Sequence, residues 1–146
     1  MNSIYFDTNI FIYLADASSP YFAEIYALTM HLQKENIQII TSTETIQEII
    51  HVSKKVKQYR QGIKNAEGTL KTINKLVPIQ DETIKIFLKK NEIYKLNESR
   101  DILHLAVCLE NNLDTILTYD GGFKNFKEIK AYTPSEYLKK YDSNKN

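Results

Sequence analysis

Residues 4–9, Ile4-Tyr5-Phe6-Asp7-Thr8-Asn9, decide the fold of this chain. The first three are β-branched or aromatic and favour a short strand, whereas the acidic residue after them is costly to bury without a partner. The strand should therefore end in a turn, and residues 11–14 should continue as a brief helix. The segment predicts a strand–turn–helix unit with a carboxylate at the carboxyl end of the strand.

The same alternation continues along the rest of the chain. Apolar residues recur at helical spacing in some segments and form short β-branched runs in others. Strands are expected at residues 4–6, 37–41, 76–79, 114–119 and 129–132, with helices at 21–35, from 43 onward, at 81–94, at 101–111 and from Pro134. Pro78 favours an edge strand, and Asp81 and Ser99 are expected as helix caps. Strands that alternate with helices predict an α/β fold with a central parallel sheet flanked by helices on both faces.

Composition limits the class of protein. The chain has 146 residues, of which 42% are hydrophobic and 25% charged, which is typical of one soluble globular domain spanning residues 1–146. Residues 142–146 are polar and are expected to fray. One cysteine excludes an intrachain disulfide framework and fits a cytoplasmic location, and no apolar run is long enough to span a membrane.

Four acidic residues mark the places where this strand–helix chain should turn: Asp7, Glu48, Asp101 and Asp120. The carboxyl ends of parallel strands, and the first turns of the helices that leave them, lie at one edge of the sheet. The four carboxylates should therefore converge. Oxygen ligands without histidine or cysteine favour Mg²⁺ or Mn²⁺, which relieves the repulsion among the acids.

The motifs around these acids resemble those of PIN-domain ribonucleases, in particular the VapC-type toxins of toxin–antitoxin systems. The matching motifs are Asp-Thr-Asn at 7–9, the helical Glu48, Asp-x-x-His-x-Ala at 101–106 and Thr-x-Asp-x-x-Phe at 118–123. The resemblance implies a three-layer fold with a central parallel sheet of about five strands. It also implies a Mg²⁺- or Mn²⁺-dependent endoribonuclease that cleaves structured RNA with an activated water.

The resemblance further implies roles for individual residues and partners. Asp7, Asp101 and Asp120 would ligate the metal, and Glu48 would be a ligand or would hold metal-bound water. Thr118 stands two positions before the last acid, where the family has its hydroxyl residue one position before. A cognate antitoxin and a homodimer are expected, with residues 21–35 as one candidate dimer surface unless that helix packs on the sheet.

Several other residues are candidates for supporting roles. Thr8 and Asn9 orient Asp7 or contact a phosphate, although Asn9 suits a helix cap equally well. His104 lies one helical turn after Asp101 and is expected to be a packed or hydrogen-bonded helix residue. The basic residues expected to steer RNA toward the acids are Lys54, Lys55, Lys57, Arg60 and Arg100.

Three other functions compete with the toxin. Asp7-x-Asn9 after the first strand also resembles a haloacid-dehalogenase phosphatase, but that family has aspartate where Asn9 stands. A housekeeping RNA-processing nuclease would share the same four acids. A non-catalytic PIN module that binds RNA or protein usually lacks one or more of them.

Overall fold

The computed structural model describes residues 2–145, and its elements alternate as the sequence pattern predicts. In chain order they are β1 (Ser3–Phe6), α1 (Thr8–Leu14), α2 (Phe22–Lys34), β2 (Gln38–Ser42), α3 (Thr43–Lys55), α4 (Tyr59–Thr72), β3 (Lys75–Val77), α5 (Asp81–Ile93), α6 (Ser99–Glu110), β4 (Thr115–Leu117), the 3₁₀ helix η1 (Gly121–Asn125), β5 (Lys130–Tyr132) and α7 (Pro134–Lys145). No helix within residues 2–145 is long and apolar enough to cross a bilayer.

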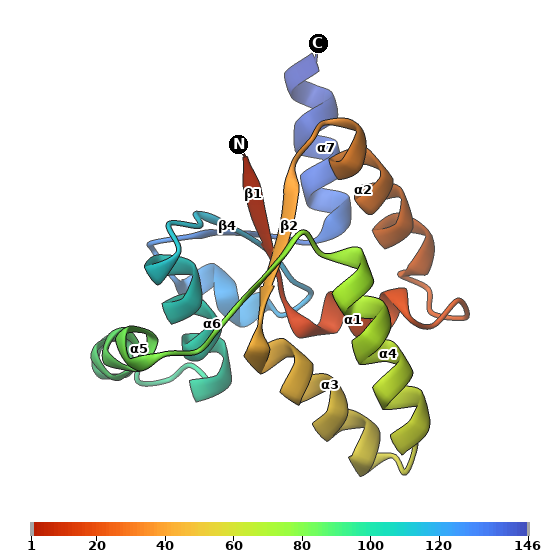
Figure 1. The fold of residues 1–146 in the computed structure, drawn as a ribbon. Coiled ribbons are helices and arrows are strands. Elements are labelled where there is room, and N and C mark those ends of the chain that lie inside the picture. The colour runs from red at the N-terminus through yellow and green to blue at the C-terminus, as the bar shows by residue number, and fades with distance from the viewer. Residues whose placement is uncertain (1, 146) are drawn as a thin grey trace.

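The five strands form one parallel sheet in the order β3-β2-β1-β4-β5 (Figure 1). β3, which immediately precedes Pro78, lies at an edge as predicted. β1 is central, and Tyr5 pairs in register with Ile40 of β2 on one side and Ile116 of β4 on the other. The prediction of a parallel sheet of about five strands is confirmed.

Two hydrophobic cores, one on each face of the sheet, create the three layers. Successive residues of a strand point to opposite faces, so Tyr5 enters one core while Ile4 and Phe6 enter the other. α5 and α6 cover the face of Tyr5, and α1, α2, α3, α4 and α7 cover the opposite face (Figure 1). Both faces of the sheet are therefore covered by helices.

The strand order reverses its direction between β1 and β4. From β1 the chain moves outward to β2 and β3, and α5 and α6 then carry it back across the sheet to β4 on the other side of β1. Ligands in such sheets bind at this reversal, beyond the carboxyl ends of the strands. Asp7 directly follows β1, and Asp120 lies three residues after the end of β4.

Local details differ from the sequence predictions. The residues that begin α5 and α6 as caps are Gln80 and Glu98, one position before Asp81 and Ser99, because those two residues are already helical. α7 continues to Lys145, so the helix extends into the segment that was expected to fray. Residue 146 lies outside the described residues.

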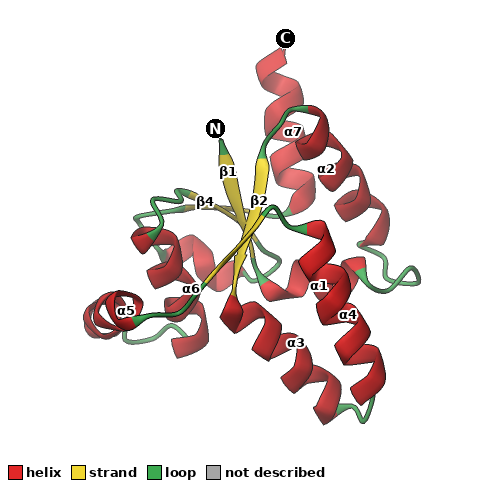
Figure 2. Cartoon of the chain, viewed as in Figure 1, coloured by secondary structure: helices red, strands yellow, loops and turns green. Residues whose placement is uncertain are grey.

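The basic stretch after Glu48 forms two helices joined by a sharp turn (Figure 2). α3 ends at Lys55, and Lys57 adopts a left-handed backbone with φ of 58° that reverses the chain into α4. The two helices then pack so closely that a Cβ on Gly62 would lie 2.0 Å from the Ser53 Oγ. Glycine at 62 is thus required by packing.

α2 matches the amphipathic helix predicted at residues 21–35, but its apolar face is not free. Ile25, Leu28 and Leu32 are fully buried in the core beside the sheet. The proposal that this face forms a dimer surface is therefore wrong, because the chain's own core already covers it.

Candidate active site

Asp7 is held at the end of β1 by several hydrogen bonds. Its Oδ1 accepts from the Thr8 backbone N–H at 2.8 Å, which also makes it the N-cap of α1. Its Oδ2 accepts from the Thr118 hydroxyl at 2.7 Å and from the Asn9 amide at 3.2 Å. Asn9 is therefore not the cap of α1, and its side chain instead lies against the carboxylate. These donors fix both oxygens of a residue that is only 6% exposed.

Asp101 and Asp120 form a second pair of carboxyl groups. Asp101 lies in the first turn of α6, and Asp120 caps η1 by accepting from the Gly122 N–H at 2.8 Å. The Asp101 side chain is in hydrogen-bonding contact with Asp120, and this contact adds to burial in raising the pKa of Asp101. A Cβ on Gly122 would approach the carboxyl oxygens of both acids, at 3.1 and 3.5 Å, so a side chain there would intrude on the site.

Glu48 reaches the site from the second turn of α3. Its Oε1 accepts from the Thr8 hydroxyl at 3.2 Å and lies 2.5 Å from Nε2 of His104. The same Nε2 is 3.6 Å from Oδ1 of Asp7. His104 therefore lies between two of the predicted metal ligands, Glu48 of α3 and Asp7 at the end of β1.

The pKa values describe a site with an excess of negative charge. Burial raises the pKa of Asp101, and contact with Asp120 adds to the effect, to about 8. Burial also raises the pKa of Asp7, against the lowering effect of His104 and Thr118. Burial lowers the pKa of His104, but Glu48 and Asp7 outweigh it and hold that pKa above its ordinary value.

The donor set fits a hard divalent cation. Within residues 2–145, no three acidic, histidine or cysteine side chains as they stand are close enough together to enclose a metal ion. However, Asp101 lies beside Asp120, and burial together with this contact raises the pKa of Asp101 to about 8, so that a proton on Asp101 offsets the repulsion between the two acids. A cation bound by their oxygens and those of Asp7 would take over that role, since Mg²⁺ and Mn²⁺ prefer carboxylate ligands.

The residues predicted to steer RNA are exposed but not all close to the acids. Lys54, Lys55, Lys57 and Arg60 surround the tip of the α3–α4 hairpin, beyond Glu48 along α3. Seven residues of helix separate Glu48 from Lys55, or about 10 Å along the axis. Arg100 is nearer to the acids, because it directly precedes Asp101. Its charge also partly offsets the rise in the pKa of Glu44 that burial and Glu48 cause.

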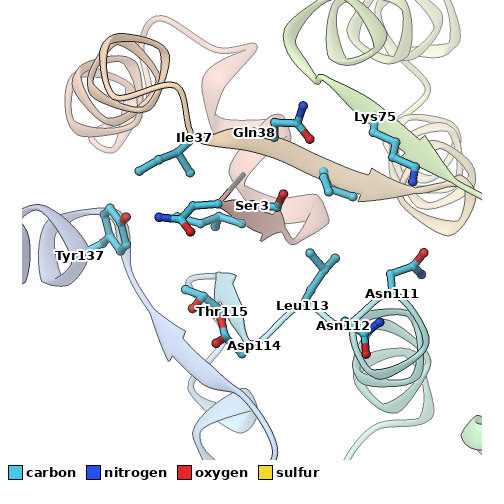
Figure 3. A pocket seen from close by; sticks show the side chains of 13 residues that line it. Ser3, Ile37, Gln38, Lys75, Asn111, Asn112, Leu113, Asp114, Thr115 and Tyr137 are labelled. Carbon is cyan, nitrogen blue, oxygen red and sulfur yellow. Dashed lines mark hydrogen bonds between the residues drawn. The ribbon is translucent and has the colours of Figure 1, made fainter.

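A cavity without any of these acids lies at the other end of the sheet. It has a volume of about 580 Å³ and lies at the amino ends of the strands, lined by residues that include Ser3, Gln38, Leu113 and Thr115 (Figure 3). None of the four acids lines this cavity. The acids instead occupy the opposite edge, where strand-end carboxylates are expected to gather.

Sequence reasoning missed two residues that build the site, Tyr5 and Asn97, whereas it expected His104 to be packed or hydrogen-bonded, as it is. Tyr5 appeared to be core material, but its hydroxyl contacts His104 Nδ1 at 2.6 Å. Asn97 donates to the Gly122 carbonyl at 3.0 Å and so holds the turn that carries Asp120. The acid-x-x-His spacing was a visible signal for His104, whereas nothing local indicated the roles of Tyr5 and Asn97.

Comparisons with known proteins agree with this geometry. Ribonuclease VapC13 of Mycobacterium tuberculosis is 27% identical over 125 residues, covering 85% of this chain and 95% of the relative. Rickettsia felis VapBC2, solved bound to a DNA fragment from its promoter, superposes with a TM-score of 0.75 at 15% identity, covering 90% of this chain and 98% of that one. The M. tuberculosis VapC20 toxin, described as cleaving the sarcin–ricin loop, gives 0.68 at 17% identity over 87% of this chain and 98% of that one.

The family model for the PIN domain matches residues 4–129, a span that includes all four acids and strands β1 to β4 apart from Ser3, while β5 lies just beyond it. The fold, the strand order and the placement of the acids at the reversal between β1 and β4 are consistent with that match. This chain belongs to the PIN domain family.

Proposed function

We propose that this chain is a Mg²⁺- or Mn²⁺-dependent endoribonuclease and the toxin of a toxin–antitoxin pair. The observation that carries the proposal is the meeting of Asp101 and Asp120 beside Asp7 at the reversal of the sheet, where burial and then the neighbouring carboxylates raise the pKa of Asp101 to about 8. The PIN family match and the VapC ribonuclease relatives support the RNA substrate.

The side chains of this site would have different roles in metal binding and catalysis. Asp7, Asp101 and Asp120 would hold the cation, and Glu48 would either join them or hold the attacking water. A bound Mg²⁺ or Mn²⁺ would activate that water and stabilise charge on the scissile phosphate. Thr118 keeps Asp7 oriented through its hydroxyl, and it also accepts from the Asp120 N–H at 2.9 Å, so it links both strand-end acids.

An acidic pocket repels RNA unless basic groups lie near it. The hairpin lysines would attract phosphates of a structured substrate away from the cut, and Arg100 would contact the backbone beside Asp101. Because the chain's net charge is only +1, this attraction is local rather than global. An RNA substrate and a buried, unpaired Cys108 both suit a cytoplasmic protein.

Protein partners form the second part of the proposal. The structural relatives include VapBC complexes of toxin with antitoxin, which supports an antitoxin partner for this chain. The exposed apolar side chains of the described surface include one group on the α3–α4 hairpin and one on α5 and the loop after it: Val56, Tyr59 and Ile63, and Leu88, Ile93 and Leu96. They offer separate surfaces for an antitoxin and for a second copy of the chain.

Cleavage of total RNA tests the nuclease directly. Protein purified free of antitoxin is incubated with total RNA and Mg²⁺ or Mn²⁺, beside a chelator control and an Asp7→Asn variant. Discrete fragments that require metal and are absent with the variant are expected, and mapping their ends identifies the substrate. Cleavage by Asp7→Asn at the wild-type rate would refute the site. Metal-independent RNA binding without cleavage would support a binding module instead.

A further inference from the structure

A buried chain of hydrogen bonds extends from the end of β2 to Glu48. The Tyr5 hydroxyl lies 2.8 Å from the Ser42 Oγ and 2.6 Å from Nδ1 of His104, whose Nε2 lies 2.5 Å from Glu48. Ser42 and Tyr5 are fully buried and His104 is 1% exposed, so water does not compete for these bonds. The four residues come from β1, β2, α3 and α6.

The donors and acceptors in this series of hydrogen bonds follow from the groups at its two ends, Glu48 and Ser42. A carboxylate only accepts, so Nε2 of His104 donates to Glu48 both in the neutral ring protonated at Nε2 and in the doubly protonated ring. In the neutral ring Nδ1 must accept, and Tyr5 is the hydroxyl in reach, while Ser42 can donate to Tyr5 in turn. Every donor along this path then has an acceptor, and the ring is held from both nitrogens.

Ser42 bonds Tyr5 and does not make the helix-capping hydrogen bond that its position would allow. It occupies the N-cap position of α3, where a serine hydroxyl ordinarily accepts from the first turn of the helix, yet it makes no such bond. The side chain contacts Tyr5 instead, so a local rule of helix formation is broken beside the candidate active site.

The consequence lies in the orientation of Glu48. Its Oε1 receives both His104 and the Thr8 hydroxyl, whereas no described residue donates to its Oε2. Two donors on one oxygen fix the carboxylate plane and leave the second oxygen for a cation or a water. Groups that orient ligands in this way commonly change metal affinity by about 10–100-fold when they are removed.

We propose that His104 and Tyr5 are positioning residues that hold Glu48 in the orientation the cation site requires, with Ser42 as the anchor. This inference rests on the proposed metal-dependent function. It assigns the Asp-x-x-His spacing a role beyond packing, and it makes a residue of the central strand part of the metal site without contact with the cation.

Tyr5→Phe is the sharpest test, because it removes one oxygen atom and keeps the ring. Tyr94→Phe is the matched control, since that hydroxyl bonds Glu128 at a surface away from the acids. Mn²⁺ affinity is measured by calorimetry without RNA, and cleavage is measured against Mn²⁺ concentration. The expected result is a Kd about tenfold weaker for Tyr5→Phe, with cleavage largely restored at saturating Mn²⁺, and no change for the control.

A second pair of variants guards against loss of the fold. His104→Gln retains an N–H donor near Glu48, whereas His104→Leu has none, so the glutamine variant should bind Mn²⁺ more tightly than the leucine variant. Thermal unfolding verifies that each variant is folded. The proposal would be overturned if folded Tyr5→Phe bound Mn²⁺ as tightly as the wild type. It would also be overturned if either His104 variant bound Mn²⁺ more tightly than the wild type, because His104 would then compete with the cation for Glu48. If the wild-type protein bound Mn²⁺ but cleaved no RNA, the proposed nuclease function would be refuted. The comparison of Mn²⁺ affinities would still test whether His104 and Tyr5 position Glu48.

Discussion

Metal binding should release the proton that Asp101 holds, which makes the affinity for Mn²⁺ depend steeply on pH. With a pKa of about 8, Asp101 holds this proton in about 99% of molecules at pH 6. Each unit of pH below 8 then weakens the apparent affinity about tenfold, or about 100-fold between pH 8 and pH 6. Calorimetry in buffers of different ionisation enthalpy measures both the affinity and the number of protons released.

The stability of the metal-free protein should change in the opposite direction. The folded pKa of Asp101 is above its unfolded value of about 3.9, so folding favours the protonated form. This contribution to the free energy of unfolding is complete below about pH 4 and is lost as the pH rises toward 8. Mn²⁺ should therefore raise the Tm more at pH 8 than at pH 6.

Asp101→Asn is the control, because an amide does not titrate. It should weaken Mn²⁺ binding at pH 8, remove most of the pH dependence and raise the Tm of the metal-free protein at that pH. An Mn²⁺ affinity that is the same at pH 6 and pH 8 in the wild type would refute the reasoning, since Asp101 would then not be exchanging a proton for the cation.

Three further changes test other parts of the account. Gly62→Ala should lower the free energy of unfolding by about 1–3 kcal/mol, because the new Cβ would lie 2.0 Å from a side-chain oxygen of α3. In the control Gly68→Ala the new Cβ has no atom within 4 Å, so this change should stabilise α4 by about 1 kcal/mol. Equal Tm values for the two variants would contradict the packing. Thr118→Val removes the hydroxyl that bonds the first acid and should weaken Mn²⁺ binding about tenfold in calorimetry, and wild-type affinity would show that this bond does not matter. The double change Lys54→Gln and Lys55→Gln, made in a cleavage-inactive background, should weaken RNA binding measured by fluorescence anisotropy. The slope of log affinity against log salt concentration should become shallower by about 0.7 for each lost phosphate contact. An unchanged slope would mean that the tip of the α3–α4 hairpin does not contact the RNA.

The sheet and the gathering of the acids could be predicted from the sequence because both depend on local patterns. Apolar runs of β-branched residues, such as residues 37–41, are distinct from helical spacing, and alternation of the two predicts parallel strands. Asp7 and Asp120 follow their strands directly or closely, so topology alone places them at one edge. Neither inference required a contact between residues distant in the sequence.

The remaining features depend on contacts that no local pattern encodes. The turn at Lys57 forms because α4 folds back on α3 through Gly62, and nothing in the basic run indicates where that turn falls. Tyr5 and His104 are 99 residues apart, and their bond appears only once β1 and α6 pack together. The cap positions were misplaced by one residue, which is the ordinary uncertainty at helix ends.

The central claim is that oxygens of Asp7, Asp101 and Asp120 hold one divalent cation. Crystals soaked in Mn²⁺ and measured for anomalous scattering would test it most directly. The account predicts a peak bounded by carboxylate oxygens of all three acids, at distances of about 2.0–2.2 Å typical of a small hard cation. No peak at saturating Mn²⁺, or a peak confined to other residues, would contradict it.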